Sequence, residues 1–494
     1  MKLSIVALLL SATALPAFGQ SGINVIVMDE GVDFTHPRIS PYMNKNIGED
    51  AEPNRLDDDR NGFVDDILGW NLVSNDGEQM PAWLMKAFTE NLARVRQLFA
   101  MNDLAEQGDM RTILQLRANR QVRELMYAYL TKSHGTHVAG IVAAASRGSA
   151  RISNLNIFTE SRLPLGMSPR SAVPALEANN NEPDANFIDF LSRRSLIDRE
   201  LANARREEAD FERVTRQYLS AHGQGVVNMS FGTMLFTMKA GLDDAWKAAL
   251  QERRMDPNTP RTAEQEANLN YFAETLYEIR EQSLANVMRA SPNVLFVVAA
   301  GNDTVDNDVN GVAPANLSAK LKNVITVAAV DKKGALTDFS DYGAKTVNVG
   351  ALGHAVKSAA PAGLEVLMSG TSMAAPYVAG VAARLRAANP LLPASEIRSI
   401  LERTGRRSPT LVGKTTTGMV IDATQALLAA QRRPGGRTVP PARTALPNGR
   451  GIQIEGSSPE FTIMLDTFAR PGTTAETNEI VREGAQRRGR RSIR

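Results

Sequence analysis

Four short runs of the chain consist almost entirely of apolar residues. They span 23–28, 226–229, 294–300 and 324–330. A continuous apolar run, unlike an alternating one, is typical of a strand that is buried on both faces of a parallel sheet. Helical patterns lie between these runs, which favours an open α/β sheet. Ligands of such sheets bind beyond the carboxyl ends of the strands.

Three further segments, 80–130, 187–219 and 262–288, show apolar positions at helical spacing and carry many charges. We interpret them as insertions into the α/β body, with bounds of about 75–131, 184–222 and 255–290. Two alternatives remain open: helices packed on the body, or an arm or lid that controls access. For 80–130 we expect a role in access.

Polar residues that could take part in catalysis lie where these elements end or begin. Asp29 and Asn302 follow apolar runs, while His134 and Ser372 precede apolar helical stretches. The first N–H groups of a helix lack partners and favour negative charge beside them. Ser and Thr are also common helix caps, so 370–376 (GTSMAAP) alone does not establish catalysis.

Taken together, these residues resemble the subtilase family of serine proteases. The resemblance rests on Asp29, on 133–140 (SHGTHVAG), on Asn302 and on Ser372, in that order, and covers most of 23–430. It implies a subtilisin-like three-layer α/β sandwich around a mostly parallel central sheet, with helical insertions.

The resemblance also implies an exported serine endopeptidase that works through an acyl-enzyme. Ser372 would be the nucleophile, His134 its base, and Asp29 the residue that orients the imidazole. Asn302 and the Ser372 N–H would form the oxyanion hole. His137 competes with His134 for the role of base, and the motif favours His134.

Two tripeptides resemble the family's substrate-binding edges. One consists of Ser230, Phe231 and Gly232, and the other of Ala299, Ala300 and Gly301. A peptide or protein substrate would add between them as an extended strand. The small residues predict room for an apolar side chain next to the scissile bond.

An acidic loop gives a separate signal. Asp57, Asp59 and Asn61 alternate before Gly62, as in the first half of a calcium-binding EF-hand loop, and Asp65 follows. The twelfth position is Leu68, so the closing Glu of that loop is missing. We expect a structural calcium, with a solvated acidic turn as the alternative. The chemistry itself requires no cofactor.

The amino-acid composition excludes several classes of function. The chain has 494 residues, a net charge of +2 and no cysteine, which excludes disulfides, thiol nucleophiles and thiolate metal sites. We expect no nucleic-acid partner. Residues 1–19 read as a signal peptide, which predicts a bacterial-type exported protein, periplasmic or secreted, without a membrane span after signal removal. The Arg/Pro/Gly-rich tail, 431–494, is expected to be disordered.

The pattern departs from the family in one respect. Only a few residues separate the predicted signal from Asp29, which leaves no room for a prodomain. Either the protease folds unaided, or the insertions or a separate inhibitor or chaperone protein assist folding and restrain activity. A different class also remains open: a catalytically inactive peptide-binding or scaffold protein with the same fold. A further alternative is an enzyme whose main substrate is its own tail.

Overall fold

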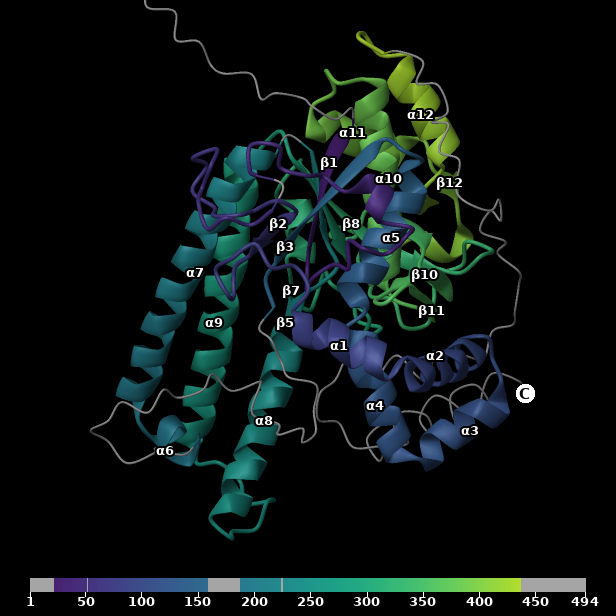
Figure 1. The fold of residues 1–494 in the computed structure, drawn as a ribbon. Coiled ribbons are helices and arrows are strands. Elements are labelled where there is room, and N and C mark those ends of the chain that lie inside the picture. Colours follow the sequence, from purple (N-terminus) through teal and green to yellow (C-terminus); the bar gives the residue numbers. More distant parts are fainter. Residues whose placement is uncertain (1–21, 51, 159–186, 224, 437–494) are drawn as a thin grey trace, which may run out of the picture.

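The structure is a computed structural model that describes residues 22–50, 52–158, 187–223 and 225–436 (Figure 1). The predicted signal peptide and the part of the predicted tail from 437 to 494 lie outside the described residues.

A nine-stranded sheet forms the centre, in the order β12-β13-β9-β8-β6-β4-β1-β3-β2. All its paired strands run parallel except the edge pair β12–β13. The predicted strands are confirmed: 226–229 and 324–330 have the expected bounds, 23–28 is one residue longer, and 294–300 is one residue shorter at each end. The strands of the sheet are β1 (Ile23–Asp29), β2 (Gly69–Asn71), β3 (Ala150–Asn156), β4 (Val226–Met229), β6 (Leu295–Ala299), β8 (Val324–Val330), β9 (Val349–Leu352), β12 (Arg406–Arg407) and β13 (Met419–Val420).

Helices cover both faces of this sheet, so the fold is the expected three-layer sandwich. Successive side chains of a strand point to opposite faces. Accordingly, Val25 and Val27 join one core cluster, which contains α5 (His134–Ser146) and α10 (Thr371–Ala388). Ile26 and Met28 join the other, to which the ends of α7 (Arg194–His222) and α9 (Ala263–Ala290) contribute. On the α10 side lie also α11 (Ala394–Arg403) and α12 (Ala423–Gln431).

The segment 80–130 forms four helices, which we call the inner insertion. They are α1 (Ala82–Glu90), α2 (Leu92–Glu106), α3 (Met110–Ala118) and α4 (Arg120–Thr131). Asp109 and Asn119 accept hydrogen bonds from the first turns of α3 and α4, which explains where these helices begin. Buried residues of this insertion, such as Phe88 and Met126, belong to the same cluster as α5 and α10. The insertion contacts a hairpin of β10 (Val356–Ala360) and β11 (Leu364–Met368).

The remaining helices form a second unit, which we call the helical arm. It contains α6 (Phe187–Ser192), α8 (Leu235–Glu252) and the halves of α7 and α9 that lie farther from the sheet (Figure 1). The segment 187–219 was expected to be one helix, but it breaks at Arg193, so that α6 packs against α7, α8 and α9. The arm has a core cluster of its own around Phe190, Trp246 and Phe272. The smaller elements are β5 (Thr233–Met234), β7 (Val312–Ala313) and the 3-10 helices Ser40–Tyr42, Ala315–Ala319 and Pro409–Leu411.

Candidate active site

The predicted site residues meet at one edge of the central sheet. β1, β4 and β6 are neighbours, and Met28 lies beside Met229, which lies beside Val298. The next residues are Asp29, Ser230 and Ala299, so they occupy the same level at the carboxyl ends of the strands. This is the edge at which parallel sheets bind ligands.

Asp29 and His134 form a direct hydrogen bond. The His134 Nδ1 donates to the Asp29 Oδ1 at 2.8 Å, and the same oxygen accepts the Glu30 N–H at 2.9 Å. Gly135 makes this approach sterically feasible, since a Cβ there would lie 2.4 Å from the carbonyl oxygen of Gly31. A glycine is therefore required at the start of α5.

The charges around this pair favour the protonated imidazole. Burial alone would lower the pKa of His134, but the Asp29 carboxylate, its hydrogen bond and the charge of Glu30 outweigh burial and raise that pKa. Burial raises the pKa of Glu30 to about 7, against the opposing charges of Lys132 and His134. Two carboxyl groups thus lie beside one histidine, and they stabilise its positive charge.

The other motif histidine has a different environment. His137 is fully buried, and its Nε2 lies 3.0 Å from the carbonyl oxygen of Val366. Burial lowers the pKa of His137 to about 3. His36 holds the carbonyl of Leu364 in the same way, at 2.9 Å. His36 and His137 thus both contact main-chain carbonyls of the strand β11. Of the two histidines in the motif, His134 is the one that contacts Asp29.

Ser372 lies in the first turn of α10 and exchanges hydrogen bonds with Ser230. Its Oγ donates to the Ser230 carbonyl at 3.1 Å, and the Ser230 Oγ donates to the Ser372 carbonyl at 2.9 Å. The Asn228 Nδ2 donates to the Ser230 Oγ at 2.9 Å. In this arrangement the Ser372 hydroxyl is not hydrogen-bonded to His134, so a Ser–His contact requires rotation of that hydroxyl.

Asn302 lies beside the residue that precedes Ser372. Its Oδ1 accepts the Thr371 N–H at 2.8 Å. Because a backbone N–H can only donate, this bond fixes which end of the amide is oxygen and leaves the Nδ2 group available as a donor. An oxyanion would need such a donor.

Asp341, which sequence reasoning missed, holds the loop that carries Asn302. It is fully buried, and its Oδ1 accepts the N–H groups of Asp303 at 2.8 Å and of Val305 at 3.0 Å. Burial raises its pKa to about 7. Gly301 has a φ of +117°, and a Cβ there would lie 2.0 Å from the Asp341 Oδ2. No motif marks Asp341 in the sequence, where it lies between Ser340 and Tyr342 in the run 337–343 (TDFSDYG).

The two predicted substrate-binding tripeptides follow adjacent strands. Ser230, Phe231 and Gly232 follow β4, and Gly301 follows β6. Ala299 and Ala300 are buried. Phe231 packs edge-to-face against Phe158, with ring centroids 5.6 Å apart. The geometry is compatible with an extended peptide between the two edges.

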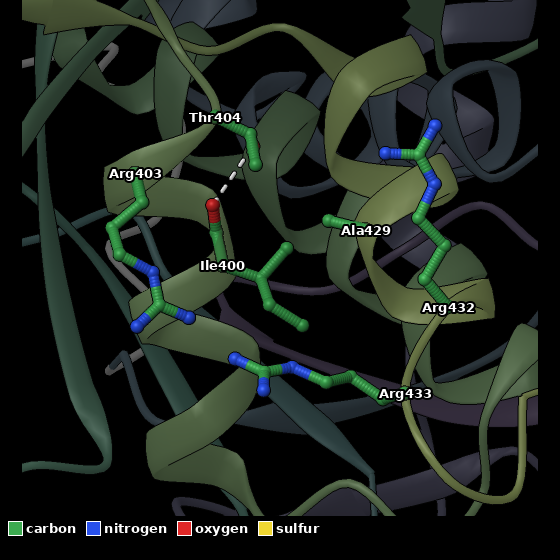
Figure 2. Close-up of a pocket in the computed structure, with 6 residues that line it drawn as sticks. All are labelled: Ile400, Arg403, Thr404, Ala429, Arg432 and Arg433. Carbon is green, nitrogen blue, oxygen red and sulfur yellow. Dashed lines mark hydrogen bonds between the residues drawn. The ribbon is translucent and has the colours of Figure 1, made fainter.

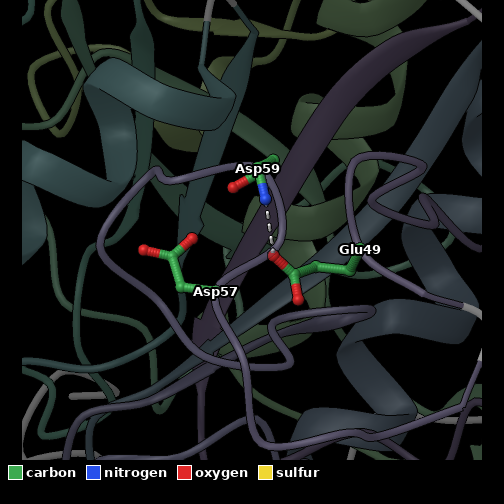
Figure 3. Close-up of side chains that lie close together, drawn as sticks. All are labelled: Glu49, Asp57 and Asp59. Carbon is green, nitrogen blue, oxygen red and sulfur yellow. Dashed lines mark hydrogen bonds between the residues drawn. The ribbon is translucent and has the colours of Figure 1, made fainter.

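The acidic loop brings together a different set of carboxylates from the predicted one (Figure 3). Oxygen atoms of Glu49, Asp57 and Asp59 lie within 4.8 Å of one another. Glu49 is 7 % exposed, and its buried Oε2 has no hydrogen-bond partner among the described residues. Asn61 adjoins this group, because its N–H donates to the Asp57 Oδ1 and the Asp59 Oδ1, both at 3.0 Å, whereas Asp65 lies outside it. The Asp65 carboxylate instead accepts the N–H groups of Asn54 and Arg55, both at 2.8 Å.

The loop is also tied to α7. The His222 Nε2 lies 2.6 Å from the Asp66 Oδ2, in a largely buried pair. His222 belongs to no motif, so this contact could not be predicted from the sequence.

A pocket of about 360 Å³ lies elsewhere, between α11 and α12 (Figure 2). Ile400 and Ala429 contribute apolar surface, and three arginines surround it. Arg403 and Arg433 both pair with Glu396. None of the predicted site residues lines this pocket.

The chain belongs to the subtilase family, whose model matches residues 20–423. Curated relatives match over shorter stretches. A subtilisin-like protease 2 of Plasmodium falciparum (isolate 3D7) is 32% identical over 138 residues, 27% of this chain and 10% of that protein. The cell wall-associated protease of Bacillus subtilis (strain 168) is 38% identical over 112 residues, 23% of this chain and 12% of that one.

A thermostable alkaline protease of Halalkalibacterium halodurans is 38% identical over 122 residues, which are 24% of this chain and 32% of that one. The chain thus spans a third or less of the length of these relatives. Among solved structures, a cold adapted subtilisin-like serine proteinase aligns with a TM-score of 0.39 and 17% identity, over 81% of this chain and 89% of that one. Within the described residues, no helix combines the length and apolarity needed to cross a bilayer.

Proposed function

We propose that this subtilase is a serine endopeptidase that hydrolyses peptide bonds through an acyl-enzyme. One observation carries the proposal: the buried Asp29 carboxylate is bonded to His134 at the sheet edge where Ser372 begins α10. A serine hydroxyl needs a base to become nucleophilic, and a histidine held by a carboxylate is such a base.

The reaction would begin when the Ser372 hydroxyl turns from the Ser230 carbonyl to the His134 Nε2. As Oγ forms a bond to the substrate carbonyl carbon, its proton passes to Nε2. The tetrahedral intermediate then expels the amine, which takes this proton, and leaves an acyl group on Ser372. Water repeats the sequence and releases the acid. Asp29 keeps Nδ1 protonated and stabilises the imidazolium.

The oxyanion would be held by two donors, the Asn302 Nδ2 and the Ser372 N–H. The Thr371 N–H orients the first, because it occupies the Asn302 oxygen. Removal of the corresponding amide from subtilisin lowers turnover by about 100- to 1,000-fold, a value that belongs to that enzyme. A loss of the same order is expected for Asn302→Ala.

Labelling with a fluorophosphonate probe tests the proposal. The wild-type protein should be labelled, and Ser372→Ala should not, at equal folded content by circular dichroism. Ser408→Ala serves as a control, since Ser408 follows β12 at the far edge of the sheet. A folded wild-type protein that resists labelling and hydrolyses no peptide would favour the inactive binding or scaffold protein instead.

The substrate would be an extended peptide that takes main-chain hydrogen bonds from the edges at Ser230–Gly232 and Ala299–Gly301. We infer a preference for an apolar side chain next to the scissile bond, since the walls consist of small residues. A panel of peptides that vary only at this position tests the inference. A preference for charged residues there would refute it.

We also propose a structural calcium, held by Glu49, Asp57 and Asp59 rather than by the full predicted set. Calcium prefers carboxylate oxygens, and the unpartnered Glu49 Oε2 is the oxygen that a cation would satisfy. Calcium should raise the melting temperature relative to a chelator. Glu49→Gln should remove the response, and the exposed Glu52→Gln should keep it. Equal melting curves in calcium and chelator would contradict the proposal.

Export, and a separate inhibitor or chaperone, are further proposals. Export predicts that protein recovered outside the cytoplasm starts near Gln20; recovery with an intact Met1 would contradict it. The need for a chaperone predicts poor refolding of the purified chain from denaturant, and full unaided recovery of activity would exclude it. Comparison of the mature masses of wild type and Ser372→Ala would show whether the tail is removed by this site.

A further inference from the structure

The inner insertion contacts the main-chain segment that leads to Ser372. The strand β11 pairs only with β10, in a two-stranded hairpin, so its other edge needs partners. α2 provides them at Leu367: Asn102 Nδ2 donates to its carbonyl oxygen, and its N–H donates to Asp103 Oδ1, each at 2.7 Å. Two adjacent side chains of one helix thus satisfy both polar groups of one strand residue.

One helical turn further along, α2 reaches a residue still closer to the nucleophile. The Ser369 Oγ donates a short hydrogen bond to the Glu106 Oε2 and accepts the Ala355 N–H at 2.8 Å. Glu106 is only 6 % exposed. A buried carboxyl group is costly unless it is satisfied, so Glu106 and Ser369 constrain each other.

The residues between Ser369 and Ser372 are held by the body. The Gly370 N–H donates to the Gly353 carbonyl at 2.7 Å, and the Thr371 N–H donates to Asn302. Every residue from 369 to 371 therefore has a defined hydrogen bond, and one of the two at Ser369, the bond to Glu106, comes from the insertion. Ser372 comes next.

The packing of the insertion argues against a movable lid. Phe88, Val95 and Met126 have no exposed surface and belong to the cluster that contains α5 and α10. Removing the insertion would expose this part of the core, at a cost of about 2 kcal/mol for each large side chain. A permanent attachment fits these contacts, and an element that opens and closes does not.

We propose that α2 positions the segment that carries Ser372, with Glu106 as a positioning residue for the nucleophile. The inference rests on the proposed role of Ser372. On this proposal, α2 affects turnover although it does not contact the substrate.

Steady-state kinetics of four full-length variants on a small peptide amide test this inference. Glu106→Ala should lower kcat by about ten- to 100-fold with little change in KM, since a small misplacement of a reacting group costs that much. Glu106→Gln, which can still accept from Ser369, should stay within about threefold of wild type. Ser369→Ala removes the same bond from the other side, so it should add little to Glu106→Ala in the double variant.

The control is Leu116→Ala. Leu116 is 1 % exposed and lies on α3, outside the hydrogen bonds that join α2 to Leu367 and Ser369, so its truncation should lower the melting temperature but leave kcat of the folded protein unchanged. The inference is overturned if Glu106→Ala keeps the wild-type kcat, or if Leu116→Ala loses kcat to the same extent. If Glu106→Ala does not fold, Ser369→Ala with an unchanged kcat overturns it. Failure of the proposed function is separate, because the wild type itself would then neither turn over nor label.

Discussion

The inner insertion and the helical arm are both helical additions to one sandwich, yet they are built in different ways. The inner insertion buries its apolar residues in the cluster that also holds α5, α10 and the sheet. The arm buries Phe190, Trp246 and Phe272 in a cluster of its own, and the ends of α7 and α9 join the core cluster on one face of the sheet. The inner insertion is therefore stabilised by the core of the body, whereas the arm is stabilised by a core of its own.

Matched core truncations should give the largest difference between the two units. Phe88→Ala and Phe272→Ala each remove a buried ring, at a cost of about 3–5 kcal/mol. Phe88→Ala should lower the main unfolding transition and the labelling of Ser372 together. Phe272→Ala should increase hydrogen exchange in the arm first, with labelling kept. If both variants lose labelling at the same temperature, the arm is not a separate unit.

The joint between arm and body is the subject of the next prediction. His222, at the end of α7, pairs with the fully buried carboxylate of Asp66. Asp66→Asn replaces the carboxylate that His222 contacts, and loss of a buried hydrogen-bond partner costs about 1–3 kcal/mol. The melting temperature should fall, whereas Asp210→Asn, in an exposed pair on the same helix, should change it little. Equal melting temperatures for the two variants would show that the joint lies elsewhere.

The pH profile of kcat/KM should reveal a smaller, electrostatic link to the inner insertion. The pKa of His134 is raised above its usual 6.5, and the base must be neutral. Activity should therefore fall as the pH drops through a value above 6.5. The free energy of unfolding depends on pH in the opposite sense. The contribution of His134 to it is complete below the pKa of His134 in the unfolded chain and is lost as the pH rises through its pKa in the folded protein.

Lys132, which follows α4, should shift this profile slightly. Its charge lowers the pKa of Glu30, and Glu30 in turn raises that of His134. In Lys132→Gln, Glu30 binds its proton more readily, so the acidic limb of the profile should move to lower pH by less than about one unit. Lys247→Gln, on α8 of the arm, should leave it in place. A shift in the arm variant alone would contradict the comparison.

Local patterns were enough to predict the body of the fold. The apolar runs identified β1, β4, β6 and β8, because a buried parallel strand needs little beyond continuous apolar side chains. Asp29 and His134 were placed by motifs, and the structure brings them together.

Contacts between distant segments could not be predicted. Asp341 accepts a main-chain N–H and Glu106 accepts the Ser369 hydroxyl, both from residues far away in the sequence, and no local pattern marks such a pairing. Glu49 lies before the acidic motif, so the motif did not indicate that it joins the cluster. Asp65 had the right spacing, but its carboxylate accepts backbone N–H groups instead. Helical periodicity likewise indicated which residues of the insertions are apolar, but not which core would receive them.

The position of β1 has a consequence for biosynthesis. This strand is the first of the described chain, yet it lies inside the sheet, and its partners β3 and β4 are translated much later. It carries Asp29, whereas Ser372 lies in the first turn of α10, more than 340 positions later in the sequence. Under the proposed function, a nascent chain would therefore hold Asp29 long before it holds the nucleophile. Proteolysis by this site would begin only after Ser372 has been translated and β1 has gained its partner strands.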